Sequence, residues 1–385
     1  MKNDLFMITL MVSFTLLVCI AVSFLVNKYF LNNASSFGEN KGGTQIRWAI
    51  ATKPPVGGMS FYATFIILIA VIILLSLFDF TTWSSNKFLL GLLIPMTIGF
   101  FAGLVDDSYN TSPWIKFAGQ FLCGHFFIMS GNYIHICESD WSNYWFTIIW
   151  VVGMMNSINM LDNMDGIVTS VSIITLGIAL MIIIQSRNII LTDVILITGI
   201  MGALVGFLFY NWNPAKIYMG DTGSQFLGAF LAWVSIQYFW SFRDALEGGF
   251  QIRQFLVPAL AFIIPLIDTT TVTFRRLARS VSPFVGGSDH TTHHLAYLGI
   301  SDKNVVRIMV GISLSAVFVI YHIVDDFKIN QWSSFKTLIV IIYYLTIFSV
   351  VQYFYEVAKK KINSTTIVKK GEDKNVEQLN EVSII

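Results

Sequence analysis

Charged residues are scarce in this sequence of 385 residues. They make up 12% of the chain, whereas hydrophobic residues make up 55%. An ordinary soluble domain carries about twice that charged fraction, and its apolar residues form short periodic stripes. The composition therefore excludes an ordinary soluble protein. The net charge of +1 says nothing about partners, and we expect no nucleic acid among them.

Cysteine is also rare, with only Cys19, Cys123 and Cys137 in the whole chain. Their spacing matches no metal or redox motif, so we interpret them as packing residues. The sequence lacks the alternating segments of about ten residues that build a membrane β-barrel. It also lacks an internal repeat of the kind that paired transporter halves show. These absences leave a helical architecture.

The apolar residues come in blocks of about 20, the length that crosses about 30 Å of hydrocarbon as a helix. Inside lipid each backbone polar group must be paired within its own segment, so such blocks form helices. We therefore expect an all-α, polytopic membrane helix bundle with eleven transmembrane helices. The eleven blocks cover residues 5–30, 60–80, 88–105, 114–132, 144–160, 168–186, 190–210, 223–241, 255–274, 304–324 and 334–357.

The distribution of Lys and Arg predicts the orientation. Block 144–160 is the weakest because it ends in polar residues. If all eleven blocks span and the N-terminus is outside, 17 of the 24 Lys and Arg residues lie inside, as the positive-inside rule requires. We expect a cytoplasmic C-terminus and a multi-pass protein of the cytoplasmic (inner) membrane. Residues 1–358 form the predicted transmembrane domain, and residues 359–385 a charged tail that we expect to be disordered.

Two acidic motifs lie at helix ends on the predicted inner side. Asp106 and Asp107 end an apolar helix, where adjacent carboxylates are costly unless a cation compensates them. They suit Mg²⁺, which prefers carboxylates, phosphate oxygens and water; a solvated pair at a helix boundary is the alternative. Asn159, Asp162 and Asp165 follow three residues apart, so neighbours in this series share a helix face. The alternative interpretation of these three residues is structural: a helix cap and a turn that ends at Gly166.

Asp221 lies in the motif MGDTGS, directly before an apolar helix. Backbone N–H groups at a helix N-terminus can face an anion, which leaves Asp221 to hold a metal. Helix capping is the alternative interpretation.

Three histidines, His290, His293 and His294, lie within five residues. Zinc is one interpretation, but His293 and His294 face different ways on a helix and no thiol pair accompanies them. We favour hydrogen bonding to a phosphate. Three nearby arginines would either assist or serve as membrane anchors: Arg275, Arg276 and Arg279.

Six motifs in order resemble those of the polyprenyl-phosphate N-acetylhexosamine-1-phosphate transferases: KPPVGG, LVDDSYN, NSINMLDNMDG, NPAKIYMGDTGS, PLIDTTTVTFRR and DHTTHHL. The resemblance covers about residues 53–295. Within this superfamily the sequence is similar to the branch that starts O-antigen, enterobacterial common antigen and teichoic acid synthesis, which eleven helices also suit. It is less similar to the phospho-MurNAc-pentapeptide branch. The second Pro of KPPVGG and the H-x-x-H-H spacing depart from the family pattern and leave the hexosamine open.

The resemblance implies an enzyme that transfers N-acetylhexosamine-1-phosphate, with GlcNAc-1-phosphate as the default, from a UDP-sugar to polyprenyl (undecaprenyl) phosphate. UMP is released, and a homodimer is allowed. Asp106, Asp107 and Asp221 would be catalytic, with Asp106 and Asp107 handling the lipid phosphate. Asp221 and Asn159 would hold Mg²⁺, or Mn²⁺ in its place. The implied substrate-binding residues are Lys53, Asn156, Asp162, Asp165, Asn211, His290, His293 and His294.

Two other functions are compatible with a helical membrane protein. An ion-coupled transporter would carry acids in the middle of its helices, whereas these acids gather at helix ends on one side. A membrane acyltransferase with the histidines as base would leave five acids and the MGDTGS loop without a role.

Overall fold

A computed structural model of the chain describes residues 2–33, 53–77, 86–186, 189–240, 251–282, 287, 289–329 and 331–382. These residues form helices joined by loops and contain no strand, which confirms the all-α class. The α-helices are α1 (Lys2–Asn32), α2 (Gly57–Leu77), α3 (Asn86–Tyr109), α4 (Pro113–Met129), α5 (Asp140–Leu161), α6 (Ile167–Ser186), α7 (Leu191–Asn211), α8 (Gly220–Tyr238), α9 (Leu256–Ala261), α10 (Ile263–Ala278), α11 (Thr291–Tyr297), α12 (Asp302–Lys328) and α13 (Ser334–Val382).

Eight helices in the described part of the chain are long and apolar enough to cross a membrane. They are α1, α2, α3, α5, α6, α7, α12 and α13. The weakest predicted block, 144–160, is among them as α5. Blocks 114–132 and 223–241 are also helical, as α4 and α8, but α4 has only 17 residues and α8 carries more polar residues. The chain is thus a polytopic helical membrane protein, while the count of eleven spans stays a prediction.

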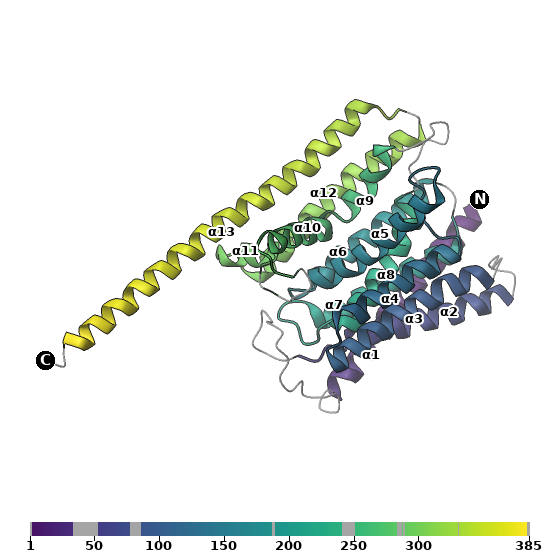
Figure 1. Cartoon of the computed structure of the whole chain (residues 1–385). Coiled ribbons are helices and arrows are strands. Elements are labelled where there is room, and N and C mark those ends of the chain that lie inside the picture. The colour runs from purple at the N-terminus through teal and green to yellow at the C-terminus, as the bar shows by residue number, and fades with distance from the viewer. Residues whose placement is uncertain are drawn as a thin grey trace.

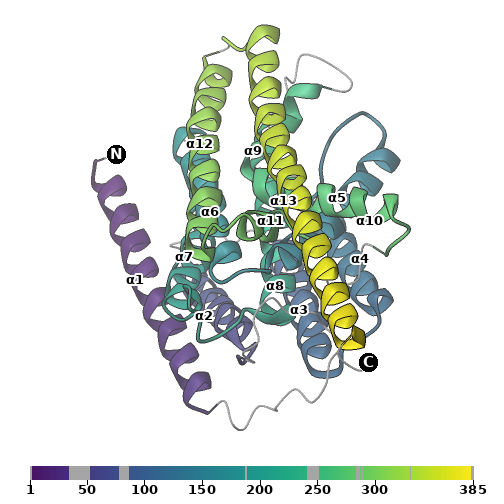
Figure 2. The same cartoon turned by 90° about the vertical axis from the view of Figure 1, so that its left-hand side faces the viewer.

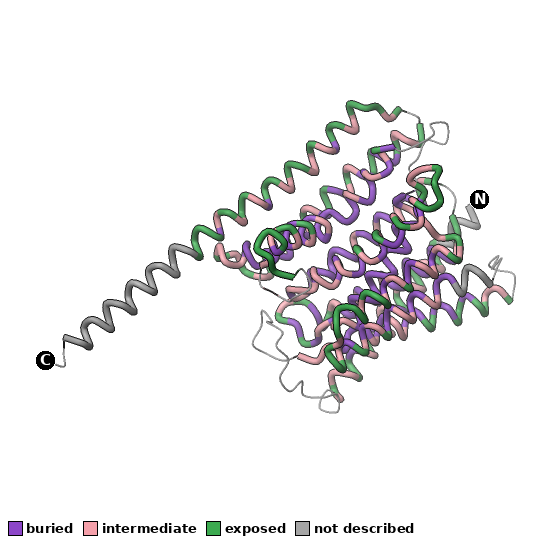
Figure 3. The backbone as a smooth tube through the Cα atoms, viewed as in Figure 1, coloured by how far each residue is buried: buried purple, intermediate pink, exposed green. Residues whose placement is uncertain are grey.

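Helix α8 lies at the centre of the bundle, in contact with α2, α3, α5 and α6. Each of its residues from Thr222 to Ile236 is buried. Figure 3 shows the same contrast for the whole chain: buried residues concentrate in the inner helices, and the described part of α13 is largely exposed. Because protein surrounds α8 instead of lipid, this helix can carry polar side chains that an outer helix could not.

The predicted block 255–274 does not form one straight helix. Helices α9 and α10 meet at 94°, and the break lies at Phe262, whose φ of −112° and ψ of 29° leave the helical region. Pro265 has no N–H to donate to the carbonyl of Ala261 four residues earlier. The Thr175 hydroxyl of α6 lies 3.1 Å from that carbonyl and shares its hydrogen between it and the Val171 carbonyl of its own helix, also at 3.1 Å. The neighbouring helix thus stabilises the interruption.

The start of α1 and the end of α13 lie at opposite ends of the bundle (Figure 1). In the turned view of Figure 2, α1 runs along one side of the bundle and α13 crosses in front of it. The ends of α3, α5 and α7 and the starts of α2, α4 and α8 meet at one end of the bundle, so the polar motifs gather there. Which end faces the cytoplasm stays a prediction.

Helix α13 is the longest helix, with 49 residues, and projects beyond the bundle (Figure 1). It runs without a break past residue 358, where the sequence suggested that the transmembrane domain ends. The disorder of the tail over residues 359–385 stays a prediction.

Candidate active site

The first turn of α8 is held by a carboxylate from another helix. The backbone N–H of Asp221 donates to Asp107 Oδ1 at 2.9 Å. The N–H and the hydroxyl of Thr222 donate to Asp107 Oδ2 at 2.8 and 2.6 Å. Helix N-termini leave such N–H groups without partners inside the helix, and Asp107 satisfies them from the end of α3. Asp107 therefore acts on the site by fixing Asp221.

Two glycines allow α8 to begin so close to its neighbours. A Cβ at Gly58 of α2 would lie 2.3 Å from the backbone nitrogen of Gly223. A Cβ at Gly103 of α3 would lie 2.2 Å from the carbonyl oxygen of Asp221. Only glycine fits either position, because the obstructing atoms belong to the backbone. The start of α8 is therefore wedged between α2 and α3.

Lys116 joins the two acidic motifs. Its Nζ lies 2.7 Å from Asp106 Oδ2 and also forms an ion pair with Asp221 Oδ2. Asp106 is 5% exposed, and its other oxygen accepts from the N–H and hydroxyl of Thr111 at 3.0 and 2.6 Å. Residues far apart in the chain thus converge on one lysine. The sequence interpretation assigned Lys116 no role in the site, although it lies in the first turn of the helix that follows the acidic pair.

Asn159 is the second predicted metal ligand, and the structure brings it to the first. Its Nδ2 donates to Asp221 Oδ1 and to the Ser224 hydroxyl, both at 2.8 Å. The described residues contain no group of three or more His, Cys, Asp or Glu side chains that could hold a metal by themselves. The two carboxylates of Asp106 and Asp221 are ligands of the kind that Mg²⁺ takes, one or two at a time, with phosphate and water oxygens completing its shell, and the metal assignment stays a prediction.

Asp165 organises a second polar group beside the first. Its Oδ2 accepts from the backbone N–H of Ala215 at 2.8 Å and from Asn213 Nδ2 at 3.2 Å. Lys53 Nζ lies 3.9 Å from the same oxygen and 5.3 Å from the centre of the Tyr218 ring. The KPPVGG segment therefore lies against the loop between α7 and α8, and Lys53 is 21% exposed in its side chain.

The amide of Asn211, a predicted substrate contact, is hydrogen-bonded within the protein, and its role toward a substrate stays a prediction. Asn211 is 3% exposed, and its Oδ1 accepts from the N–H of Gly166 at 3.1 Å and the hydroxyl of Thr169 at 3.0 Å. Its Nδ2 donates to the carbonyl of Ile217 at 3.1 Å. Asn211 therefore braces the loop that carries the second polar group. Asp162 ends α5 as its C-cap residue and is partly buried.

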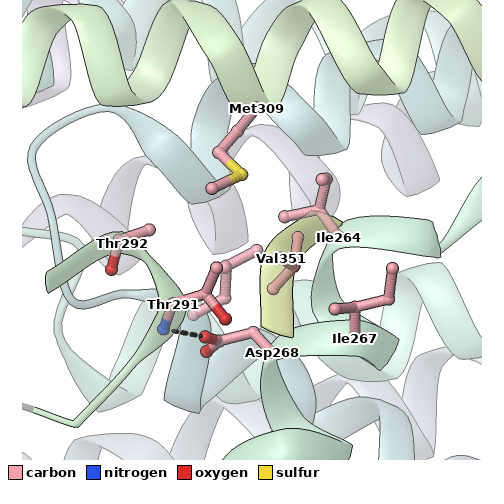
Figure 4. Close-up of a pocket in the computed structure, with 8 residues that line it drawn as sticks. Ile264, Ile267, Asp268, Thr291, Thr292, Met309 and Val351 are labelled. Atoms are coloured by element: carbon pink, nitrogen blue, oxygen red, sulfur yellow. Dashed lines mark hydrogen bonds between the residues drawn. The ribbon is translucent and has the colours of Figure 1, made fainter. Parts of the chain in front are cut away.

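The histidine motif forms the short helix α11 and is fixed by acids that the sequence interpretation did not assign. His290 Nδ1 lies 2.8 Å from Asp268 Oδ2, and the N–H of Thr291 donates to Asp268 Oδ1 at 2.8 Å. Figure 4 shows Asp268 reaching the start of α11. The Thr292 hydroxyl donates to Asn163 Oδ1 at 2.7 Å. That bond ties α11 to the end of α5, near Asn159.

Arg276 forms a two-point ion pair with Asp289, with contacts of 2.6 and 3.1 Å. Burial alone would raise the pKa of Asp289, but the hydrogen bonds and charge of Arg276 outweigh it and lower the pKa to about 2. Burial, with the charge of His290, lowers the pKa of His293 to about 4. Burial and the charge of Arg275 lower the pKa of His294 to about 4. Both imidazoles are therefore neutral at pH 7 and can act as hydrogen-bonding groups.

A small cavity lies between α10, α11, α12 and α13 (Figure 4). Its lining includes Asp268, Thr292, Met309 and Val351. Its volume of about 10 Å³ has room for about one water molecule. It is therefore a packing defect beside the histidine helix and too small for a nucleotide.

The chain belongs to glycosyl transferase family 4. The model of that family matches residues 89–239, the segment that carries Asp106, Lys116, Asn159 and Asp221. A phospho-N-acetylmuramoyl-pentapeptide-transferase of Streptococcus pyogenes serotype M1 is 31% identical over 257 residues, which are 58% of this chain and 73% of the relative. The chain is thus a membrane-embedded transferase.

A second relative bears on the branch within the family. The probable undecaprenyl-phosphate N-acetylglucosaminyl 1-phosphate transferase of Bacillus subtilis strain 168 is 27% identical over 265 residues. The match covers 66% of this chain and 71% of that protein, a longer share of this chain than the pentapeptide transferase covers. The resemblance stated from the motifs is confirmed.

Proposed function

We propose that the chain transfers N-acetylhexosamine-1-phosphate from a UDP-sugar to a polyprenyl phosphate, with GlcNAc-1-phosphate and undecaprenyl phosphate as the first substrates to test. The products are the polyprenyl-diphosphate-sugar and UMP. In a cell this reaction would begin the membrane stage of a surface polysaccharide, at the cytoplasmic membrane. Both relatives are transferases of a phosphate-linked sugar, which supports the general reaction, and the Bacillus subtilis relative is named for undecaprenyl phosphate, which supports the lipid acceptor.

The observation that carries the proposal is the group formed by Asp106, Lys116, Asn159 and Asp221. It combines two carboxylates, a cation and a carboxamide at the end of a membrane bundle. Transfer between two phosphates needs charge neutralisation and alignment more than covalent chemistry by the protein. This group offers both.

The proposed reaction forms one phosphate bond, breaks another, and needs no added general base. A phosphate monoester has a second pKa of about 6 and is largely ionised at neutral pH. One of its oxygens attacks the sugar-bearing phosphorus of the UDP-sugar and forms the new diphosphate bond. The bond between that phosphorus and the oxygen that leaves with UMP breaks. Because one diphosphate bond replaces another, we expect the reaction to be reversible.

The chain's own residues would divide this work between them. Lys116 would contribute positive charge beside the reacting phosphates, and Asp107 would hold the α8 N-terminus in place. Asp221 and Asn159 would hold Mg²⁺, which neutralises phosphate charge when bound. The neutral histidines of α11 and Lys53 would contact the nucleotide-sugar and its diphosphate.

An ion-coupled transporter is the rival function, and the positions of the acids argue against it. Asp106, Asp107, Asp165 and Asp221 lie at helix ends at one end of the bundle. A transport path would require titratable groups between the two ends.

Purified protein in detergent tests the proposal directly. It would be incubated with undecaprenyl phosphate, Mg²⁺ and a panel of UDP-sugars, and UMP release would be measured. We expect release with at least one UDP-N-acetylhexosamine and only when the lipid is present. No UMP release with any sugar of the panel would reject the proposed function.

A further inference from the structure

A second layer of polar side chains lies one helical turn deeper in the bundle than the group around Asp221. Lys116, Asn159 and Asp221 lie near the site end of α4, α5 and α8, respectively. Four residues after Lys116 on α4 is Gln120. On α5, Asn156 lies three residues before Asn159. On α8, Gln225 lies four residues after Asp221. We call Gln120, Asn156 and Gln225 the carboxamide layer.

The three carboxamides bond to one another. Gln120 Nε2 donates to Asn156 Oδ1 at 3.2 Å and to Gln225 Oε1 at 3.1 Å. Asn156 Nδ2 donates back to Gln120 Oε1 at 2.8 Å. Gln120 is therefore the central member, and it connects α4, α5 and α8, the helices that carry Lys116, Asn159 and Asp221. Asn156, predicted as a substrate contact, has both atoms of its amide engaged here.

Joining helices through buried carboxamides has an unfavourable desolvation free energy. Gln120 and Gln225 are each 1% exposed, and Gln225 Nε2 has no hydrogen-bond partner among the described residues. Burying a polar group without a partner is unfavourable, and an apolar side chain of similar shape is often more stable. A contribution to stability alone therefore gives no reason for amides at these positions.

Hydrogen bonds, unlike apolar contacts, fix the register of two helices, that is, their relative position along the helix axis. Apolar side chains pack at several sliding positions along a helix, whereas a hydrogen bond is lost within a fraction of an ångström. One turn away, Lys116 must reach both Asp106 and Asp221, and Asn159 must reach Asp221. A slip of α4 or α5 against α8 would break those contacts together.

We propose that Gln120 and Gln225 are positioning residues for the transferase site. The carboxamide layer holds α4, α5 and α8 in the register that keeps Lys116 and Asn159 on Asp221. The inference deepens the proposed function and rests on it for its activity readout. It assigns these glutamines no contact with either substrate.

Methionine variants test the inference, because methionine has nearly the shape of glutamine without its hydrogen bonds. We expect Gln225→Met and Gln120→Met each to lower kcat for UMP release at least about tenfold, since a misplacement of about 1 Å can cost about 10²-fold. The KM for the UDP-sugar should change less than kcat. The double variant should be little worse than either single variant, because the two act through one shared bond.

Ser235→Ala is the matched control. Trp150 Nε1 donates to the Ser235 hydroxyl at 2.7 Å, so this bond also joins α5 to α8, but far from the site. If interhelical bonds matter only for folding, Ser235→Ala and Gln225→Met will lower the melting temperature and kcat in parallel. That outcome, or full kcat in both methionine variants, would overturn the inference.

A second readout does not depend on catalysis. The Lys116 side chain is 21% exposed and paired with two carboxylates, which slows its acylation by a water-soluble amine reagent. We expect Gln120→Met to raise the acylation rate of Lys116, measured by mass spectrometry of its peptide, at least about threefold, and Ser235→Ala to leave it unchanged. An unchanged rate in Gln120→Met would reject the positioning role. A wild-type protein that releases no UMP would reject the proposed function, and the Lys116 rates would still decide the register.

Discussion

At the scale of single residues, the Asp221 carboxylate contacts both Lys116 and Asn159. Asparagine at this position keeps the shape but removes the charge and an oxygen ligand. We expect Asp221→Asn to lower kcat by about 10²- to 10³-fold, the effect of losing one strong electrostatic contact in a catalytic site. Excess EDTA should abolish wild-type activity if the site holds Mg²⁺.

Asp193→Asn is the control for that experiment. Asp193 is also buried, at 2% exposure, but lies at the other end of the bundle and hydrogen-bonds Tyr238. Its variant should elute as folded protein and retain its kcat. Full activity of wild-type protein in EDTA would contradict the metal assignment, and full activity of Asp221→Asn would contradict its catalytic role.

Lys116 gives a second prediction at this scale. Without its ammonium group, Asp106 and Asp221 would repel each other and the reacting phosphates would lose a positive charge. We expect Lys116→Met to lower kcat about 100-fold, and Lys116→Arg to retain more activity because it keeps the charge. Steady-state UMP release distinguishes the two variants. Equal activity of Lys116→Met and wild type would show that the ion pair has no part in turnover.

The sequence predicted part of this residue-level picture. The contact of Asn159 with Asp221 was predicted as a shared metal site, and the structure brings the two together. Asp107 was predicted to handle the lipid phosphate, a role that stays a prediction, but the structure uses both its oxygens to cap α8. Spacing along the chain reveals neighbours within one helix. It does not reveal which side chain of another helix fills a gap, so Lys116 and Asp268 were missed.

At the scale of elements, the break between α9 and α10 depends on α6. Thr175→Val removes the hydroxyl that donates to the Ala261 carbonyl. A buried acceptor left without a donor costs about 1–3 kcal/mol, so we expect a clear fall in the melting temperature in detergent.

Thr198→Val is the matched control for this change. The Thr198 hydroxyl is buried and has no hydrogen-bond partner among the described residues, so its removal should be neutral or stabilising. Equal losses of stability in the two variants would show that the Thr175 bond does not support the break.

Helix α13 supplies a contact to the histidine helix. The Arg275 guanidinium lies 3.3 Å from the centre of the Tyr355 ring, and the His294 ring lies 4.6 Å from it. A cation–π contact contributes about 0.5–2 kcal/mol. We expect Tyr355→Leu to raise the KM for the UDP-sugar about threefold to thirtyfold, and Tyr355→Phe to keep the wild-type value.

Tyr353→Leu controls for general damage to α13. Tyr353 is on the same helix but is 65% exposed, so its loss should not change the KM. A similar KM for Tyr355→Leu and wild type would show that α13 does not act on the histidine helix.

The helices themselves were the easiest elements to predict. Long apolar blocks such as 168–186 leave the backbone no other way to pair its polar groups in lipid, and α6 follows that block closely. The break between α9 and α10 was harder to predict. Pro265 alone does not break a helix at its start, and the Thr175 donor that stabilises the gap lies 86 residues away.

At the scale of the whole molecule, the membrane topology can be tested with single cysteines. Ser282 lies in the segment after α10 and is exposed. In a protein without native cysteines, we expect Ser282→Cys to resist a membrane-impermeant thiol reagent in intact cells, because the C-terminal side should be cytoplasmic. The same cysteine should react once the cells are opened.

Native Cys137 provides the positive control. It lies in the loop before α5, at the end of the bundle opposite Asp221, and is partly exposed. A variant that retains only Cys137 should label in intact cells. Labelling of Ser282→Cys in intact cells would contradict the predicted orientation and with it the access of cytosolic UDP-sugars to the site.

The tight fit of Gly58 and Gly103 against α8 has a consequence for how substrate preference can change. Both glycines contact backbone atoms of α8, and no side-chain substitution can reshape such a contact without moving whole helices. Other parts of the site carry side chains that can be exchanged, such as His293 on α11 and Lys53 in the segment before α2. Evolution toward a different sugar, and mutations that confer resistance to an inhibitor, should therefore arise in those segments.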